Sequence, residues 1–448
     1  MFAVIAVLVL ALLVLVHRWL WIRLVRDTTV PRGTARRIGT TLAFTLPLLS
    51  LAALTTGRAG APFWLQQSVA WPGYMWLAVL LYLALAMLLA EPVRALLLRR
   101  APAHIQPLQS PQPLRRLRRG GPGAEPPGLS GSGRSPGNGG RAGRGEAPQG
   151  PATALDDPLP REQSLSPAVQ DPAGATRRQF VARAIGGAAA LAATGTVGYG
   201  TYGVLRGPRV KRVQVPLAKL PRAAHGFRIA VVSDIHLGPV LGRAHTTRIV
   251  ETINRTQPDL IAVVGDLVDG NVHDLGSAAE PLRRLRARHG SYFVTGNHEY
   301  FSGAQQWIDH VRELGLTPLE NARRALPYFD LAGVNDVQGE TEGHGPDFVA
   351  ALGDRDRARA AVLMAHQPVV IHDAVRHGVD LQLSGHTHGG QLWPGNYLAE
   401  LANPTVAGLE RYGDTQLYVS RGAGAWGPPV RVGAPSDITV VELASYQA

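Results

Sequence analysis

Histidine, aspartate and asparagine gather in five short blocks in the second half of this 448-residue chain. Each block directly follows a short apolar run that is typical of a buried strand. Carboxylates, imidazoles and amide oxygens are hard or borderline ligands for divalent metals, and five such blocks in one order rarely arise by chance. The blocks are Asp234-Ile235-His236, Gly265-Asp266, Gly296-Asn297-His298-Glu299, Ala365-His366 and Gly385-His386-Thr387-His388.

These residue types favour hydrolysis of a phosphoric ester. Two divalent ions about 3.5–4 Å apart lower the pKa of a bridging water and neutralise charge on the phosphoryl oxygens. Such a pair needs one carboxylate that binds both ions, and Asp266 is the natural candidate. His298 follows the candidate ligand Asn297 directly, so we expect it to meet the substrate and to protonate the departing oxygen.

Strands and helices alternate in this half of the chain. The alternation predicts an α/β architecture with functional residues on loops at the strand ends. We expect strands at residues 227–233, 259–264, 291–294, 360–364 and 380–383, and helices at 247–255, 281–288 and 306–314.

Over roughly residues 225–443 the chain resembles the calcineurin-like metallophosphoesterase superfamily, because the order and the intervals of the five blocks agree with that family. More narrowly, the segments 384–391 (SGHTHGGQ) and 418–424 (YVSRGAG) resemble bacterial membrane-linked phosphodiesterases of the YkuE/YaeI type. The resemblance implies a β-sandwich flanked by helices.

The resemblance also implies a role for each block residue. His298 would be the catalytic acid. Two divalent metal ions would be the cofactors, and ligands of these types do not distinguish Mn, Fe, Zn and Co. One ion would be held by Asp234, His236, Asp266 and His388, and the other by Asp266, Asn297, His366 and His386.

Residues near the blocks have less specific assignments. Asp269 either orients a metal ligand from behind or caps its own turn, and Glu299 is expected to orient a ligand rather than to bind metal. Arg421 and Arg431 are candidate phosphate contacts, with ordinary surface positions as the alternative. The eight histidines of this half outside the blocks, His245 among them, are expected at the solvated surface.

The basic excess of the chain lies outside its catalytic half. The net charge is +12, yet from Arg206 onward 24 basic residues face 25 acidic ones. The excess flanks apolar segments and fills a linker, which indicates membrane topology and makes nucleic acid an unexpected partner. The absence of cysteine excludes disulfides, cysteine-bound zinc and thiol nucleophiles.

Residues 1–100 predict three transmembrane helices, in segments that begin at Phe2, Ile38 and Gly73. A cleaved secretory signal is the alternative for the first segment, but no basic stretch precedes it and further spans follow. The first loop holds five arginines and the second holds Arg58 alone. The positive-inside rule therefore places the first loop in the cytoplasm and the N-terminus outside.

Residues 101–175 are rich in Pro, Gly and Arg, which predicts a disordered linker. Residues 176–205 resemble a twin-arginine export signal, carried by Thr176-Arg177-Arg178-Gln179-Phe180, and an ordinary transmembrane helix is the alternative. Either interpretation puts the predicted catalytic domain, residues 206–448, outside the cytoplasm.

The sequence thus predicts an integral protein of the cytoplasmic membrane that hydrolyses phosphodiester bonds by attack of metal-activated water. Tethering to the outer face favours lipid-linked or envelope substrates, so the expected partners are membrane lipid and a phosphorylated small molecule or lipid. No protein partner can be inferred. Two alternatives remain: a pyrophosphohydrolase or nucleotidase acting on nucleotide-linked lipids, and a non-catalytic membrane protein that binds a phosphorylated ligand.

Overall fold

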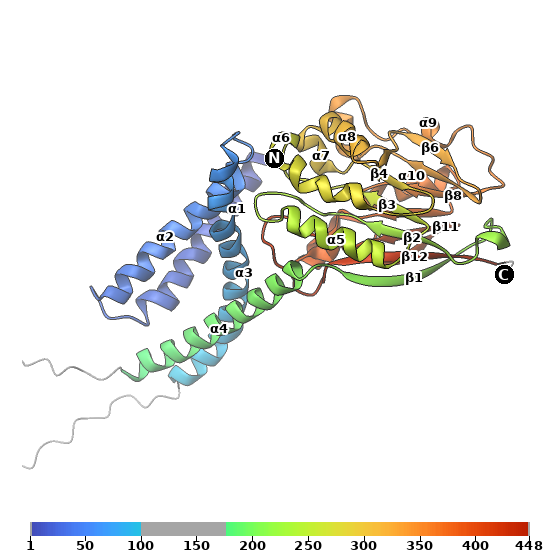
Figure 1. Cartoon of the computed structure of the whole chain (residues 1–448). Coiled ribbons are helices and arrows are strands. Elements are labelled where there is room, and N and C mark those ends of the chain that lie inside the picture. The colour runs from blue at the N-terminus through green and yellow to red at the C-terminus, as the bar shows by residue number, and fades with distance from the viewer. Residues whose placement is uncertain (1, 100–175, 447–448) are drawn as a thin grey trace, which may run out of the picture. The chain divides into compact units, whose positions relative to one another are not determined.

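The computed structural model describes residues 2–99 and 176–446, so the predicted linker at 101–175 lies outside the described residues. Four long helices precede the strands: α1 (Phe2–Trp21), α2 (Thr34–Thr55), α3 (Phe63–Arg99) and α4 (Arg177–Leu205) (Figure 1). Helices α2, α3 and α4 are each long and apolar enough to cross a membrane. The predicted spans from Ile38 and Gly73 lie within α2 and α3, and α3 starts ten residues earlier than its predicted span.

Helix α4 buries a stripe of small residues. Small side chains allow the backbones of membrane helices to approach closely, and Ala189, Ala193 and Val197 pack in one cluster with residues of α3 such as Met87. A capping box between Thr176 and Gln179 starts the helix, so both arginines of the predicted export signal lie in its first turn. The buried stripe comprises Ala182, Gly186, Ala189, Ala193, Val197, Gly200 and Val204.

Two six-stranded mixed sheets follow. The first has the order β1 (Arg209–Leu217), β12 (Asp437–Ser445), β2 (Phe227–Val232), β3 (Leu260–Val264), β4 (Ser291–Val294) and β5 (Thr317–Pro318). The second has the order β10 (Gly408–Tyr412), β11 (Thr415–Val419), β9 (Leu381–Ser384), β8 (Ala360–Met364), β7 (Phe329–Gly333) and β6 (Ala322–Ala325).

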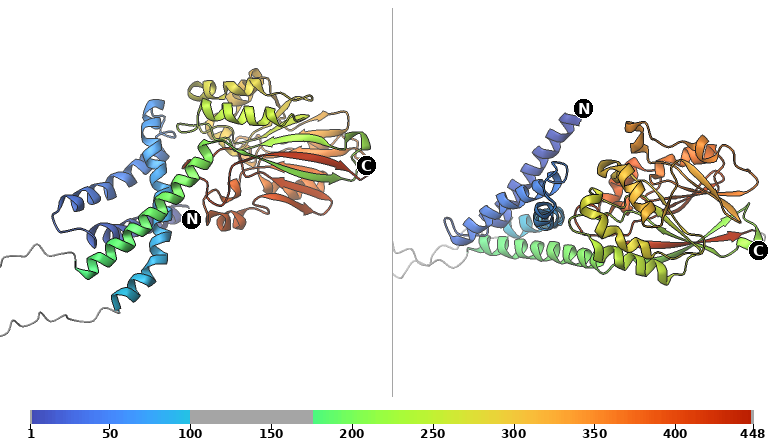
Figure 2. Two further views of the ribbon diagram at one scale, coloured as in Figure 1. Left: turned by 60° about the horizontal axis from the view of Figure 1, so that its bottom comes forward. Right: turned by 45° about the horizontal axis from the view of Figure 1, so that its top comes forward.

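Side chains that alternate along each strand pack into two different layers of the fold. In β2, Ile229 and Val231 pack into the core between the sheets, whereas Ala230 and Val232 pack on the helix-covered side. Helices α5 (Arg243–Arg255), α6 (Val272–Ala279) and α8 (Ala304–Glu313) cover that side, and α9 (Phe348–Leu352) and α10 (Ile371–Arg376) cover the second sheet (Figures 1 and 2). The predicted α/β sandwich flanked by helices is confirmed.

All five predicted strands are present within one residue of their expected ends. The helices predicted at 247–255 and 306–314 correspond to α5 and α8. The helix predicted at 281–288 is wrong: a short 3-10 helix covers only Glu280–Arg284, and the chain turns to an extended conformation at Leu285. The regular helix is α6, which starts at the Asn271 cap and ends before Pro281, a residue that cannot donate within a helix.

Strand direction brings the five blocks together. Strands β2, β3 and β4 run parallel to one another, as do β8 and β9. The carboxyl ends of parallel neighbours share one edge of their sheet, so the loops that follow them meet there.

Candidate metal centre

The first group of possible ligands combines the loops after β2 and β9. Asp234, His236 and His388 are all buried and hold their ligand atoms close to one another. Nε2 of His388 lies 3.3 Å from Oδ1 of Asp234 and 2.9 Å from Nε2 of His236. Oδ2 of Asp266 lies 3.7 Å from Nε2 of His236, so the carboxylate after β3 reaches this group as well.

The second group combines Asp266 with the loops after β8 and β9. Asp266, His366 and His386 hold their ligand atoms close together, and Nε2 of His366 lies 3.1 Å from Oδ2 of Asp266. Asn297, at the start of α7 (Asn297–Ser302), places its Oδ1 3.0 Å from Nδ1 of His386. Asp266 is therefore shared by both groups, which is the position that a bridging carboxylate requires.

Hydrogen bonds behind the imidazoles leave their other nitrogens available to a cation. Nδ1 of His366 lies 2.8 Å from the carbonyl oxygen of Val264, which can only accept, so Nδ1 carries the hydrogen. Nε2 of the same ring faces Oδ2 of Asp266 and makes no hydrogen bond of normal geometry with any described residue. Nδ1 of His236 is held in the same way, 2.8 Å from Oδ1 of Asp269. A carboxylate or carbonyl behind a ligand histidine is common in metal sites, so these residues fit the two divalent ions.

The charges of the cluster also fit divalent cations. Burial raises the pKa of the Asp234 carboxyl, and the nearby Asp266 raises it further. Burial lowers the pKa of His366, but Asp266 outweighs burial and holds that pKa well above its usual value. Burial lowers the pKa of His386 to about 4, and burial with the nearby charge of Arg431 holds the pKa of His388 well below its usual value, so both rings are neutral at physiological pH. His386 and His388 are therefore in the neutral form that binds a metal ion, whereas His366 would have to release a proton to bind one.

Five of the candidate ligands have left-handed backbone conformations. They are five of the nine non-glycine residues with positive φ in the described ranges 2–99 and 176–446. Such conformations cost about 1–3 kcal/mol each and cluster at functional sites, where the surrounding structure holds them in place. The residues are Asp234 (53°), His236 (50°), Asp266 (52°), His386 (72°) and His388 (53°).

Glycines beside the ligands make this close packing possible. A Cβ atom on Gly296 would lie 2.2 Å from Oδ1 of Asp266, and one on Gly385 would lie 1.9 Å from Oγ of Ser233. Any side chain at either position would displace the loop that carries its neighbouring ligand.

His298 lies at the edge of the cluster and is partly exposed. Its backbone N–H donates to Oδ1 of Asp266 at 2.9 Å, and its Nδ1 lies 2.7 Å from Oδ1 of Asp269. Burial lowers the pKa of His298, but the hydrogen bond and the charge of Asp269 outweigh burial and raise it to about 9. The rings of Phe301 and Trp426 contact the imidazole at centroid distances of 5.6 and 5.8 Å. The group is thus a protonated imidazole held at the border of the site.

Glu299 is completely buried behind the cluster. Its carboxylate accepts the backbone N–H groups of Asp266, Leu267 and Gly296 at 3.0, 2.7 and 2.6 Å. It therefore links the loops after β3 and β4 and orients Asp266 through the backbone. Asp269 likewise orients His236 and His298.

The two arginines of the tail lie at different places. The side chain of Arg421 packs beside Gly389. Arg431 is buried, and its guanidinium donates to the carbonyl oxygens of Gly424 and His388 and to Nδ1 of His388, which lies 3.0 Å away. Arg431 thus holds a candidate ligand in place rather than lying at the surface. The C-terminal position of this residue gave no sign of that role, because the contact joins segments 43 residues apart.

His245 differs from its expected surface position. Only 2% of this residue is exposed, and neither ring nitrogen has a hydrogen-bond partner among the described residues. It lies on the buried face of α5, a face that the neighbouring polar residues concealed in the sequence.

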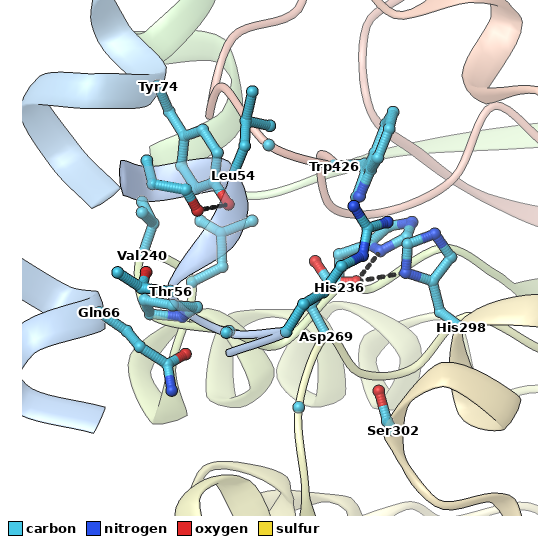
Figure 3. A pocket seen from close by; sticks show the side chains of 18 of the residues that line it. Leu54, Thr56, Gln66, Tyr74, His236, Val240, Asp269, His298, Ser302 and Trp426 are labelled. Atoms are coloured by element: carbon cyan, nitrogen blue, oxygen red, sulfur yellow. Dashed lines mark hydrogen bonds and ion pairs between the residues drawn. The ribbon is translucent and has the colours of Figure 1, made fainter. Parts of the chain in front are cut away.

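A pocket of about 370 Å³ opens beside the cluster (Figure 3). His236, Asp269 and His298 line one side of it, together with Trp426. The ligand cluster therefore has an adjacent space in which a substrate can be bound.

Comparisons with known proteins agree with this site. The family model for calcineurin-like phosphoesterases matches residues 227–390, which include all five blocks. A zebrafish (Danio rerio) transmembrane protein with metallophosphoesterase domain is 39% identical over 259 residues, covering 55% of this chain and 59% of that protein. The Bacillus subtilis metallophosphoesterase YkuE, itself uncharacterised, is 30% identical, and the match covers 60% of this chain and 98% of that one.

The extent of these matches differs among the relatives. The chain spans less than two thirds of the length of the two vertebrate proteins, from Danio rerio and Bos taurus, with 59% and 57% covered. A solved dimetal phosphatase from Danio rerio has a TM-score of 0.33 at 12% identity, over 49% of this chain and 93% of that one. Since YkuE is matched over nearly its whole length and carries the same domain, this chain belongs to the calcineurin-like metallophosphoesterase family.

Proposed function

We propose that the chain is a membrane-anchored phosphodiesterase that uses two divalent metal ions. The observation that carries the proposal is the position of Asp266, whose carboxylate lies in one group of ligand atoms with His236 and His298 and in another with His366 and His386. Bound there, the metal ions would supply an activated water and neutralise the charge of the phosphoryl oxygens. The other steps belong to residues of the chain.

His298 would donate a proton to the departing oxygen. Because Asp269 accepts from Nδ1, the proton on Nε2 is the one available to a bound ester. The raised pKa keeps this ring protonated at neutral pH, as a general acid needs to be. Phe301 and Trp426 contact the ring edge-on and help to hold it in this orientation.

The arrangement of the helices supports an extracytoplasmic site. The positive-inside rule assigns the loop between α2 and α3, with Arg58 as its single basic residue, to the outer face. That loop lines the pocket beside His236 and His298. The arginine-rich first loop pairs instead with the far part of α3, where Arg23 lies 2.6 Å from Glu91. A catalytic domain outside the cytoplasm is consistent with both contacts, and lipid-linked or envelope phosphodiesters are the proposed substrates.

Turnover of a small diester by the full-length protein tests the chemistry. We expect the protein, purified in detergent with Mn²⁺, to hydrolyse bis-p-nitrophenyl phosphate, and Asp266→Ala and His298→Ala to lose most of that activity. Asp309→Ala provides a matched control, because this carboxylate is exposed on α8 and pairs only with surface groups. Equal turnover by Asp266→Ala and Asp309→Ala would contradict the proposal.

Product analysis separates the alternative activities. A diesterase leaves a phosphomonoester, whereas a pyrophosphohydrolase splits only the anhydride of a nucleotide-linked substrate. Cleavage of the anhydride with the diester left intact would favour the pyrophosphohydrolase. Metal-dependent binding of a phosphorylated ligand without turnover of either substrate would favour the non-catalytic alternative.

A further inference from the structure

Membrane helices form the wall of the pocket that faces the ligand cluster. Leu54 of α2 and Tyr74 of α3 lie across it from His298 (Figure 3), and Leu77 of α3 also lines it. The loop between the two helices contributes further lining through Thr56 to Arg58. The pocket is therefore shared between the catalytic domain and a pair of spans.

Close packing fixes this wall. A Cβ on Gly73 of α3 would lie 2.7 Å from that of Ala53 and 2.4 Å from the carbonyl oxygen of Leu49, so α2 and α3 touch along their backbones. The hydroxyl of Tyr74 donates to the carbonyl oxygen of Ala53 at 2.9 Å. On the other side, Phe63 packs against the core of the catalytic domain. The hairpin of α2 and α3 is thus held firmly in place as one wall of the pocket.

The lining combines polar and apolar side chains. His236, Asp269 and His298 provide polar groups beside the ligand cluster, and Arg58 of the hairpin adds a cation suited to anionic oxygens. Leu54 and Leu77 provide apolar surface on the helices, and Val240 does so on the catalytic domain. Leu54 is 44% exposed, and Leu51, one turn earlier on α2, is 57% exposed. Apolar surface therefore continues from the pocket onto the face of a membrane-spanning helix.

We propose that the hairpin of α2 and α3 selects a phosphoester that carries a long apolar chain, with Leu54 as a specificity-determining residue. This inference rests on the proposed function for the chemistry but adds the binding element. The phosphate of the substrate would lie beside the histidines, and its alkyl chain would extend along Leu54 toward the bilayer. A short soluble phosphoester would occupy only the space beside the histidines and make no use of the helix wall.

Two diesters with the same leaving group test the selectivity: hexadecyl p-nitrophenyl phosphate and ethyl p-nitrophenyl phosphate, both with the full-length protein in detergent micelles. Burial of about two methylene groups against the helices is worth about a tenfold preference in kcat/KM for the hexadecyl ester. Leu54→Gln is expected to reduce that preference about fivefold, because it places a polar amide where the alkyl chain of the substrate would be buried.

Leu51→Gln is the matched control, since it makes the same change one turn away at a residue that does not line the pocket. It alters any general attraction of the substrate to the micelle or helix surface as much as Leu54→Gln does. We expect it to keep both the wild-type turnover of the ethyl ester and the wild-type preference. An equal loss of preference in the two variants, or no preference in the wild type, would overturn the inference.

A measurement independent of hydrolysis distinguishes failure of the inference from failure of the proposed function. Hexadecyl phosphate with a diazirine in its chain is photolysed with the protein, and the labelled residues are mapped by mass spectrometry. We expect labelling of α2 and α3 near Leu54 that excess hexadecyl phosphate removes and ethyl phosphate does not. Absence of hydrolysis with this labelling present would refute only the activity, whereas labelling elsewhere refutes the inference.

Discussion

Asp269 accepts from the Nδ1 atom of His298 at 2.7 Å, and the same carboxylate oxygen lies 2.8 Å from Nδ1 of His236. One side chain thus orients both the proposed acid and a proposed metal ligand. Burial would raise the pKa of Asp269, but His236 and His298 outweigh it and lower the pKa to about 2, so the carboxylate is ionised at all working pH values.

Replacement of this carboxylate should reduce activity without unfolding the protein. We expect Asp269→Asn to lower kcat about 10–100-fold, the usual effect of removing a group that orients a ligand histidine. Steady-state kinetics together with metal analysis measure it. In a His298→Ala background the same change should have a smaller effect, because part of its action passes through His298; equal effects in the two backgrounds would assign the whole action to His236.

Glu299 should prove essential for the integrity of the site. Glu299→Ala leaves three buried N–H groups, those of Asp266, Leu267 and Gly296, without their acceptor. At about 1–3 kcal/mol for each unsatisfied group, we expect a loss of at least about 3 kcal/mol in the free energy of unfolding. Thermal unfolding followed by tryptophan fluorescence checks this. Glu313→Ala on α8, at an exposed carboxylate, should leave Tm within a degree or two of the wild type.

Chelation should destabilise the protein as well as inactivate it. A ligand that binds only the folded state at about 100 times its Kd adds about 2.7 kcal/mol of stability. We therefore expect EDTA to lower Tm and added Mn²⁺ to restore it. Asp266→Ala, which removes the shared carboxylate, should respond much less. An unchanged Tm in the wild type on chelation would indicate that these residues bind no metal.

The buried His245 predicts loss of stability in mild acid. Burial, followed by Arg248 and Arg431, lowers its pKa from 6.5 to about 3 in the folded state. Between these values the unfolded chain binds a proton that the folded chain does not, so stability falls as pH drops below 6.5 and is fully present above it. From pH 6.5 to about pH 5 the loss is about 2 kcal/mol. His245→Leu should show a smaller decrease in Tm over this interval; an identical decrease would contradict the assignment.

The strands and the order of the site residues could be predicted because both depend on local pattern. Short β-branched runs such as 227–232 have few alternatives to buried strands, and each ends at a candidate ligand. The left-handed backbone of Asp234 and His236 could not be predicted, because these conformations are imposed by contacts with Gly265 and Asp266. The positions of Arg431 and His245 depend in the same way on contacts between segments distant in sequence.

The part of the pocket that the membrane helices contribute could not be predicted from the sequence. From the sequence, Arg58 is predicted to lie in a loop and Leu54 in a transmembrane helix. Nothing in their own segments indicates a binding surface. Their position in the same pocket as His298 follows from the packing of α3 and α4 on the catalytic domain, and such long-range contacts cannot be predicted from local sequence.

The hydroxyl of Tyr82 on α3 donates to the carbonyl oxygen of Trp393 at 3.0 Å, and Gly200 of α4 leaves no room for a side chain against Val430. Two spans are thereby attached directly to the body that carries the histidines. Such an enzyme has little freedom to swing away from its anchor. If the proposed function is correct, this attachment would hold the site at a fixed height above the lipid surface and would favour substrates that diffuse within the bilayer over those that arrive from bulk solvent.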